Sequence, residues 1–343
     1  MKKILLSVVA VMLAVFSVSF SASALTVSPS KIELKGDPGE VVKGEFELLN
    51  EQKNTITLYA SYENFEASGE DGSPNFVAGD YGLATWIKAQ DSITLKPGEY
   101  KKIPFTITVP ENADAGGHFA AIFWGTQPPA ASGETSVSIG AKTGILVLLT
   151  VSGEVKEGGS LLEFYTKDNQ RFFNFLPVDF YYRFQNGGGD RLKPVGTVKI
   201  KNTFWITTDE FDANKTSGNV LPNSTRRFLT TWEGISKEDS GVAVLEPEKT
   251  AEESGFIGRY FERVSYQWDH FAMGMYTAKL GLTYGNDATI VGDSFVFFVL
   301  PWQLIIVMAF IIIIAFFVLR FAIRKYNRWI ISQAIGVNRR LRK

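Results

Sequence analysis

The sequence predicts an all-β protein with two tandem immunoglobulin-like β-sandwich domains followed by a single transmembrane helix. Phe, Tyr and Trp make up 13% of the 343 residues and glycine is frequent, which favours strands and tight turns over a helical bundle. Short runs of alternating apolar and polar residues recur in both halves of the chain, separated by turn sequences such as DPG and KPGE. One long stretch near the C-terminal end is apolar without interruption.

The first 24 residues have the pattern of a secretory signal peptide. Two lysines precede an uncharged apolar run, and the small residues Ala22, Ser23 and Ala24 follow it. We predict cleavage after Ala24, so that the mature chain begins LTVSPSKIEL. The alternative is a first membrane anchor, but polar sequence begins directly after the small residues.

Residues 25–156 are predicted to form the first sandwich. Runs such as EVVKGEFELLN, TITLYASYENF and KKIPFTITV alternate apolar and polar residues, which is typical of half-buried strands. Several short strands with turn signals between them indicate an immunoglobulin-like sandwich. Residues 157–299 repeat the pattern and are predicted to form the second sandwich, with an inserted segment at residues 233–271.

Three motifs occur in the same order in both halves. LLNEQKNTITLYA corresponds to FQNGGGDRLKPVGTVKI, LKPGEYKKIPF to LPNSTRRFLTT, and GGHFAAIFWG to GMYTAKLGLTYG. Pro97-Gly98 and Pro222-Asn223 suit a tight turn whose second central residue has a positive φ. We expect the aromatic residues Phe119 and Tyr276, which follow a glycine in the third motif, to point inward.

The inserted segment contains a predicted amphipathic helix. At 100° per residue its large apolar side chains fall on one face: Phe256, Ile257, Tyr260, Phe261, Val264, Trp268 and Phe271. Ser254 is a candidate N-cap, and a strand pair around residues 264–268 is the alternative structure. The helix either covers its own sandwich or docks on a partner or the outer leaflet. The candidate partner-binding residues are Phe256, Tyr260, Phe261 and Trp268.

Residues 300–323 are predicted to form a transmembrane helix. About 20 apolar residues at 1.5 Å each cross a hydrocarbon layer of ~30 Å, and a soluble core helix is rarely apolar on every face. Residues 324–343 form a basic tail, and the last 24 residues contain eight basic and no acidic side chains. The candidate membrane-interface residues are Trp302, Arg320, Arg324, Lys325, Arg328 and Trp329.

The positive-inside rule places the C-terminus in the cytoplasm and both sandwiches outside the cell. The protein is therefore predicted to be a single-pass protein of the cell membrane. Its anchor and basic tail contact membrane lipids, because basic residues next to a span are attracted to anionic headgroups. The span explains the basic charge, so nucleic acid is not an expected partner.

The sequence predicts no enzyme, cofactor or metal site. Cysteine is absent, which excludes disulfides and thiolate chemistry. His118 and His270 lie far apart in the sequence without a second histidine at metal-ligand spacing. A hydrolase of the cell envelope would need two carboxylates facing each other across a cleft, and the sequence alone cannot pair them.

The chain resembles the WxL-interacting protein family of Gram-positive cell surfaces. The resemblance rests on the LTVSPSKIELKGDPGE, LKPGEYKKIPFTITVPENADAGGHFAAIFWG, NVLPNSTRRF and GMYTAKLGLTYG segments and on the closing span with its basic tail. It implies a non-enzymatic binding or scaffold protein, anchored in the bacterial cell envelope, that engages surface proteins or peptidoglycan. The alternative function is a membrane-tethered, chaperone-like assembly factor that lends a strand edge to exported subunits.

The predicted orientation can be tested with protease on intact cells. Because both sandwiches are expected outside, protease should digest residues 25–298 and spare an epitope placed after Lys343. Immunoblotting of the epitope measures the outcome, and lysed cells provide the control. Loss of the epitope from intact cells would contradict the orientation.

Overall fold

The computed structural model describes residues 25–128, 142–234, 256–285 and 288–340. The predicted signal peptide and part of the predicted insertion lie outside these ranges. The described chain forms two compact units. Unit 1 extends to Gly158 and also includes Asn186–Arg191 and Leu221–Ser224, and unit 2 contains the rest. The chain thus enters unit 2 at Gly159, next to the predicted domain boundary.

Unit 1 contains two packed sheets. The first has the order β1-β3-β8-β6 and the second the order β2-β10-β9-β4-β5, with β7 also paired to β4. The strands are β1 (Leu25–Ser28), β2 (Lys31–Gly36), β3 (Val41–Asn50), β4 (Ile56–Ser68), β5 (Ser73–Val77), β6 (Ile87–Lys88), β7 (Ser92–Leu95), β8 (Tyr100–Thr108), β9 (Gly116–Gly125) and β10 (Lys142–Val151), and a short helix α2 (Leu83–Trp86) precedes β6.

Unit 2 repeats this arrangement. One sheet has the order β11-β13-β16 and the other the order β12-β18-β17-β14-β15. The strands are β11 (Gly159–Thr166), β12 (Phe172–Phe173), β13 (Val178–Asn186), β14 (Val195–Lys201), β15 (Thr207–Asp212), β16 (Ser224–Trp232), β17 (Gly274–Tyr284) and β18 (Thr289–Val299), with a 3-10 turn η1 (Lys167–Asn169) and the helices α3 (Phe256–Asp269) and α4 (Trp302–Arg340).

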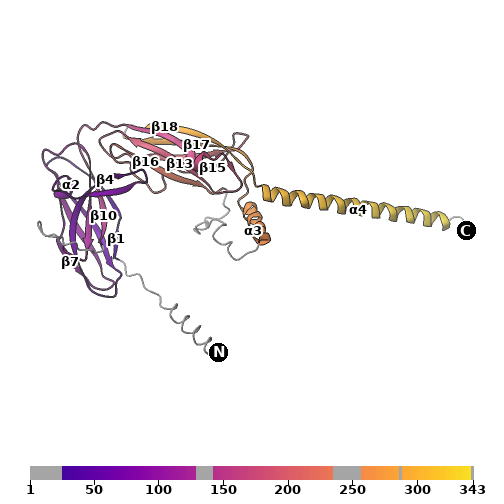
Figure 1. Ribbon diagram of the computed structural model, residues 1–343, viewed down its shortest axis with the longest axis horizontal. Coiled ribbons are helices and arrows are strands. Elements are labelled where there is room, and N and C mark those ends of the chain that lie inside the picture. The colour runs from indigo at the N-terminus through magenta and orange to yellow at the C-terminus, as the bar shows by residue number, and fades with distance from the viewer. Residues whose placement is uncertain (1–24, 129–141, 235–255, 286–287, 341–343) are drawn as a thin grey trace, which may run out of the picture. The chain divides into compact units, whose positions relative to one another are not determined.

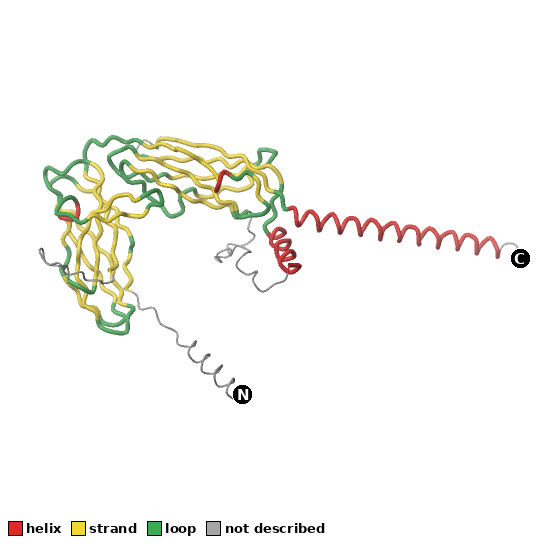
Figure 2. Tube along the Cα trace, viewed as in Figure 1, coloured by secondary structure: helices red, strands yellow, loops and turns green. Residues whose placement is uncertain are grey.

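The all-β fold class with immunoglobulin-like sandwiches and a C-terminal apolar helix is confirmed. Figure 2 shows the strands in yellow and α4 as one long red helix. Each unit has its own core, because alternate residues of facing strands point between the sheets. In unit 1 Phe46, Phe105 and Trp124 are fully buried, and in unit 2 Tyr182, Phe184 and Phe297 are.

The two units use equivalent strands in the same order. The motif pairs of the sequence fall on β3–β4 and β13–β14, on β8 and β16, and on β9 and β17. The predicted turns are also present, since Gly98 has φ 70° and Asn223 has φ 54°. The internal repeat is therefore a repeat of one sandwich topology.

The expected position of Phe119 is wrong. Gly116, with φ 114°, pairs with the end of β10 in the same way that Gly274, with φ 120°, pairs with the end of β18. The two glycines that correspond are thus Gly116 and Gly274. A shift of one residue moves a side chain to the other face of a strand. Phe119 consequently packs against Phe65 on the outer face, whereas Tyr276 packs against the core as expected.

A buried asparagine ends both β3 and β13, the strands on which the first motif begins. Asn50 is 0% exposed, its Nδ2 donates to the carbonyl oxygens of Leu95, Lys96 and Asn54, and its Oδ1 accepts from the N–H of Gln52. Asn186 is its counterpart, because its Oδ1 accepts from the N–H of Gly188, again two residues further on. Equivalent asparagine side chains therefore hold the equivalent loops after β3 and β13.

The hydrogen bonds of the Asn50 side chain predict an effect on stability. Asn50→Ala removes one amide that serves three carbonyl groups and should lower the free energy of unfolding by about 1–3 kcal/mol, the usual cost of unsatisfied buried polar groups. Asn54→Ala is the control, since only its backbone carbonyl takes part, and it should stay within about 0.5 kcal/mol. Urea unfolding measures both. Equal effects of the two changes would contradict the assigned role of Asn50.

Candidate functional site

The predicted amphipathic helix of the insertion is present as α3, so the alternative strand pair around residues 264–268 is excluded. Figure 1 shows α3 next to the start of α4 at one end of unit 2. The predicted N-cap Ser254 lies outside the described residues.

A buried pair of glutamines joins α3 to α4. Gln267 and Gln303 are 1% and 4% exposed. Gln267 Nε2 donates to Gln303 Oε1 at 2.5 Å and to the carbonyl of Asn174 at 3.2 Å. Gln267 Oε1 accepts from the N–H of Leu304 at 3.0 Å, one of the N–H groups that have no partner within the first turn of a helix. A side chain of α3 therefore caps α4.

The four candidate partner-binding residues do not form one surface. Tyr260 is half-buried and its hydroxyl donates to the carbonyl of Gln303 at 3.2 Å, so it belongs to the α3–α4 contact. Phe261 and Trp268 are exposed. Phe256 begins the helix, and its side chain lies outside what the structure describes. Partner binding by this set stays a prediction.

The candidate membrane-interface residues all lie on α4. Trp302 begins the helix, and Trp302–Ile330 is long and apolar enough to cross a membrane. Almost none of this stretch is buried, unlike a soluble core helix. The helix continues to Arg340, so the predicted basic tail continues the span rather than starting a separate segment. Arg320, Arg324, Lys325, Arg328 and Trp329 are exposed on it, and their contact with lipid stays a prediction.

The outer edge of β18 distinguishes unit 2 from unit 1. In unit 1 the equivalent strand β10 pairs with β2 at six positions, from Leu146 to Val151. In unit 2 β18 pairs with β12 only at Phe298 and Val299. Along Thr289–Phe297, no strand among the described residues pairs with this edge. Unpaired edge groups are a template for another strand.

The direction of the β18 N–H groups follows from its pairing. The N–H groups of Phe298 and Leu300 donate to Arg171 and Phe173, on the side away from β17. The register with β17 continues without a shift to Thr289, and N–H directions alternate along a strand. The N–H groups of Ile290, Gly292, Ser294 and Val296 therefore point to the open edge.

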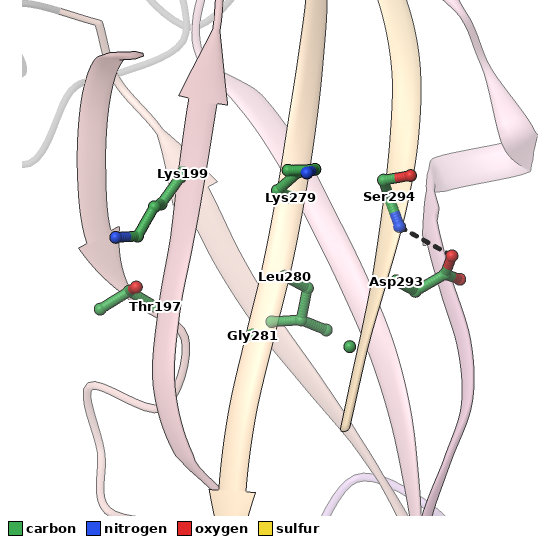
Figure 3. Close-up of a pocket in the computed structure, with 8 residues that line it drawn as sticks. Thr197, Lys199, Lys279, Leu280, Gly281, Asp293 and Ser294 are labelled. Carbon is green, nitrogen blue, oxygen red and sulfur yellow. Dashed lines mark hydrogen bonds between the residues drawn. The ribbon is translucent and has the colours of Figure 1, made fainter. Parts of the chain in front are cut away.

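Asp293 partly protects this edge. Its Oδ1 accepts the N–H of Ser294 at 2.7 Å, as the dashed line in Figure 3 shows. Charged side chains on edge strands are a common protection against unwanted pairing. An incoming strand would have to replace this one contact.

A shallow hollow of about 530 Å³ lies on the face of the same sheet (Figure 3). Gly281 and Gly292 face each other across β17 and β18, and Lys199 and Lys279 line the hollow from neighbouring strands. Lys199 is neutralised by Glu210 at 3.2 Å. The pKa of Glu210 is lowered mainly by a hydrogen bond from Thr197 and next by a hydrogen bond from Lys199. The lining contains no histidine and no aromatic ring.

The two histidines lie in separate surroundings. His118 contacts the carbonyl of Asp114 and the ring of Trp86, and His270 stacks on Tyr266. Across residues 25–128, 142–234, 256–285 and 288–340, no group of three or more His, Asp or Glu side chains is placed to hold a metal ion.

Comparisons with known proteins gave structural neighbours only. No family model and no curated protein matches the chain. The class 5 fimbriae chaperone CfaA is 14% identical, with 63% of this chain and 95% of that chain covered and a TM-score of 0.35. The Salmonella enterica complex of SafA pilin with the SafB chaperone is 7% identical, with coverages of 82% and 99% and a TM-score of 0.34.

A third neighbour is the CsuC–CsuE chaperone–adhesion subunit complex of Acinetobacter baumannii, at 14% identity, coverages of 60% and 90% and a TM-score of 0.31. These TM-scores are too low for the three neighbours to support a functional argument. None of the three is a WxL-interacting protein, and that resemblance stays a prediction.

The sequence does not reveal the open edge of β18, because a strand sequence does not say whether its second edge is paired. The one signal in the sequence is the shortness of the FF stretch at Phe172–Phe173 compared with the KIELKG stretch that forms β2.

The glutamine pair predicts that Gln267 holds α3 in place. Gln267→Ala leaves the Leu304 N–H and the buried Gln303 amide without these contacts, and should destabilise the junction by about 1–3 kcal/mol. Amide hydrogen exchange across residues 256–269 should become faster, while exposed Arg263→Ala on the same helix should change little. Unchanged exchange in Gln267→Ala would contradict the capping role.

Proposed function

We propose that the protein is a membrane-tethered, non-enzymatic binding protein that holds an extended segment of an exported protein as an added strand on β18. This is a chaperone-like assembly role. The observation that carries it is the unpaired edge along Thr289–Phe297. The unit 1 equivalents of its last four residues, Leu146–Leu149, are paired with β2.

The internal repeat makes the open edge informative. Two copies of one topology bury similar cores, so folding alone explains the elements that they share. The β10 edge is paired at six positions and the β18 edge at two. Natural proteins usually cover or shorten such an edge, and strand addition is a known way for a sheet to bind an extended peptide.

The local chemistry supports an extended polypeptide as ligand. The added strand would take its affinity from backbone hydrogen bonds to β18. Among the described residues, three of the four outward N–H groups have no contact of the kind that Asp293 makes with Ser294. Exposed Ile290 and Val296 provide apolar contacts for its side chains. Backbone pairing tolerates many sequences, which suits the capture of different subunits.

The anchor supports work at the membrane surface. With α4 crossing the membrane and the basic residues in the cytoplasm, both units stand where exported chains emerge. A scaffold for folded surface proteins or for peptidoglycan is the second function that the sequence suggests. The hollow on the same sheet gives that function little support, because its lining has no aromatic ring on which a sugar could stack.

Substitutions on β18 that should weaken or strengthen the capture of an extended segment test the proposal. Val296→Pro removes an outward N–H and places a ring on the open edge, while the pairing with β17 is kept because proline is tolerated on edge strands. Capture of extended polypeptides should be lost. Asp293→Ala frees the Ser294 N–H and should strengthen capture. Val296→Ala, which keeps the N–H, is the matched control.

The measurement is photo-cross-linking from residue 290 of the full chain in nanodiscs, with exported proteins of its own envelope offered either unfolded or folded. We expect cross-links to unfolded proteins in the natural chain and in Val296→Ala, but not in Val296→Pro. Cross-links that survive Val296→Pro would overturn strand addition. Retention of folded proteins without any dependence on β18 would favour the scaffold function instead.

A further inference from the structure

The end of unit 2 from which α4 emerges carries an exposed apolar surface. Lys201 at the end of β14 pairs with Thr277, and Gly274 at the start of β17 pairs with Val299 at the end of β18. The loop after β14, the end of α3 and the start of α4 therefore lie at one end of the same sheet. Figure 1 shows α3 and α4 at this end.

The loop between β14 and β15 exposes three consecutive large apolar residues. Phe204, Trp205 and Ile206 are 80%, 66% and 61% exposed. Asn202 holds the loop, because its Oδ1 accepts the N–H groups of Phe204 and Ile206 at 3.0 and 3.1 Å. Its backbone also exchanges hydrogen bonds with Trp205 and Ile206. The three side chains are thus presented by an ordered turn.

Trp205 occupies a strained backbone conformation. Its φ is 62°, a region that bulky residues rarely adopt and that glycine adopts without cost. Backbone outliers of this kind concentrate at functional sites. Packing among the described residues does not offset this backbone strain, because the Trp205 side chain is exposed. This indicates an environment outside the described chain that takes up the ring.

A second apolar surface continues into α4. Trp268, Phe271 and Met273 line one side of a groove of about 680 Å³, and the first turns of α4, from Leu304 to Ile312, line the other. Ile312 follows Trp302 by ten residues, which is about 15 Å along a helix. This is half of a hydrocarbon layer of ~30 Å.

We propose that this end of unit 2 is immersed in the leaflet next to it, with Phe204–Ile206 at the boundary between headgroups and acyl chains and the α3–α4 groove filled by acyl chains. The occupant follows from continuity with α4. A bilayer that reaches Trp302 also surrounds Ile305, Met308 and Ile312, so the groove that these side chains line opens to hydrocarbon and not to water.

The glutamine pair gives this surface a fixed position. Because Gln267 caps α4 and contacts Gln303, the exposed side chains of α3 are held next to the start of the span. Aromatic side chains, tryptophan above all, favour the membrane interface. The sandwich would then stand at a defined height above the membrane rather than move freely on a linker.

The absence of cysteine from the chain provides the test. Phe204→Cys and Trp268→Cys are each labelled with an environment-sensitive fluorophore in the full chain, in vesicles of phosphatidylcholine and phosphatidylglycerol that contain a nitroxide lipid. Ile305→Cys on α4 is the positive control. Ile290→Cys is the matched negative control, since Ile290 is 79% exposed at the opposite end of the same sheet.

We expect the labels at 204 and 268 to shift to the blue and to lose emission through the nitroxide as the label at 305 does, while the label at 290 does not respond. Quenching at 204 and 268 no greater than at 290 would overturn the proposal, provided that 305 is quenched. The proposal would also be overturned if the labels at 204 and 268 are protected from aqueous iodide only until the protein is diluted in lipid. In that case a second copy of the chain covers the surface. Phe261→Cys replaces any labelled variant that fails to fold.

Discussion

The edge of every β-sheet carries backbone groups that are paired, covered or left to water, and the two sandwiches of this chain treat one such edge differently. An unpaired N–H or C=O is tolerated where water reaches it, but a long row of such groups invites another strand. In unit 1 the six paired positions of β2 cover the end strand of the larger sheet. In unit 2 the two residues of β12 leave most of the equivalent strand without a hydrogen-bonded partner among the described strands. The proposed function depends on this difference.

The rest of each unit keeps that strand in a fixed position. The cores are filled from both sheets by aromatic and branched side chains, and the buried asparagines Asn50 and Asn186 fix the equivalent loops after β3 and β13. An edge strand on a rigid sheet can pair without the ordering cost that a mobile segment would carry. Asp293, which holds one outward N–H of this edge, reduces pairing with unwanted chains without closing the edge along its length.

The attachment of α4 to unit 2 adds a second constraint. Gln267 and Gln303 satisfy each other in a buried position and cap the helix, so the span is joined to the sandwich through side chains as well as through the backbone. With the apolar loop at Phe204–Ile206 at the same end, the open edge of β18 would run away from the lipid surface toward Thr289. A captured segment would then extend from the membrane along the sheet.

The sequence alone determined the fold class, the repeat and the apolar helix, because alternation, turn residues and uninterrupted apolarity are local properties. It also predicted α3 from its 100° periodicity. It misplaced Phe119, because aligning the wrong glycine by one position reverses the face of a strand. Only the tertiary structure decided which edge of β18 stays open and that Tyr260 faces α4 while Phe261 and Trp268 face outward. It also decided that Phe204–Ile206 lies at the end of the sheet from which α4 emerges. Pairing partners and shared ends of a sheet depend on residues far apart in the chain, and no local pattern records them.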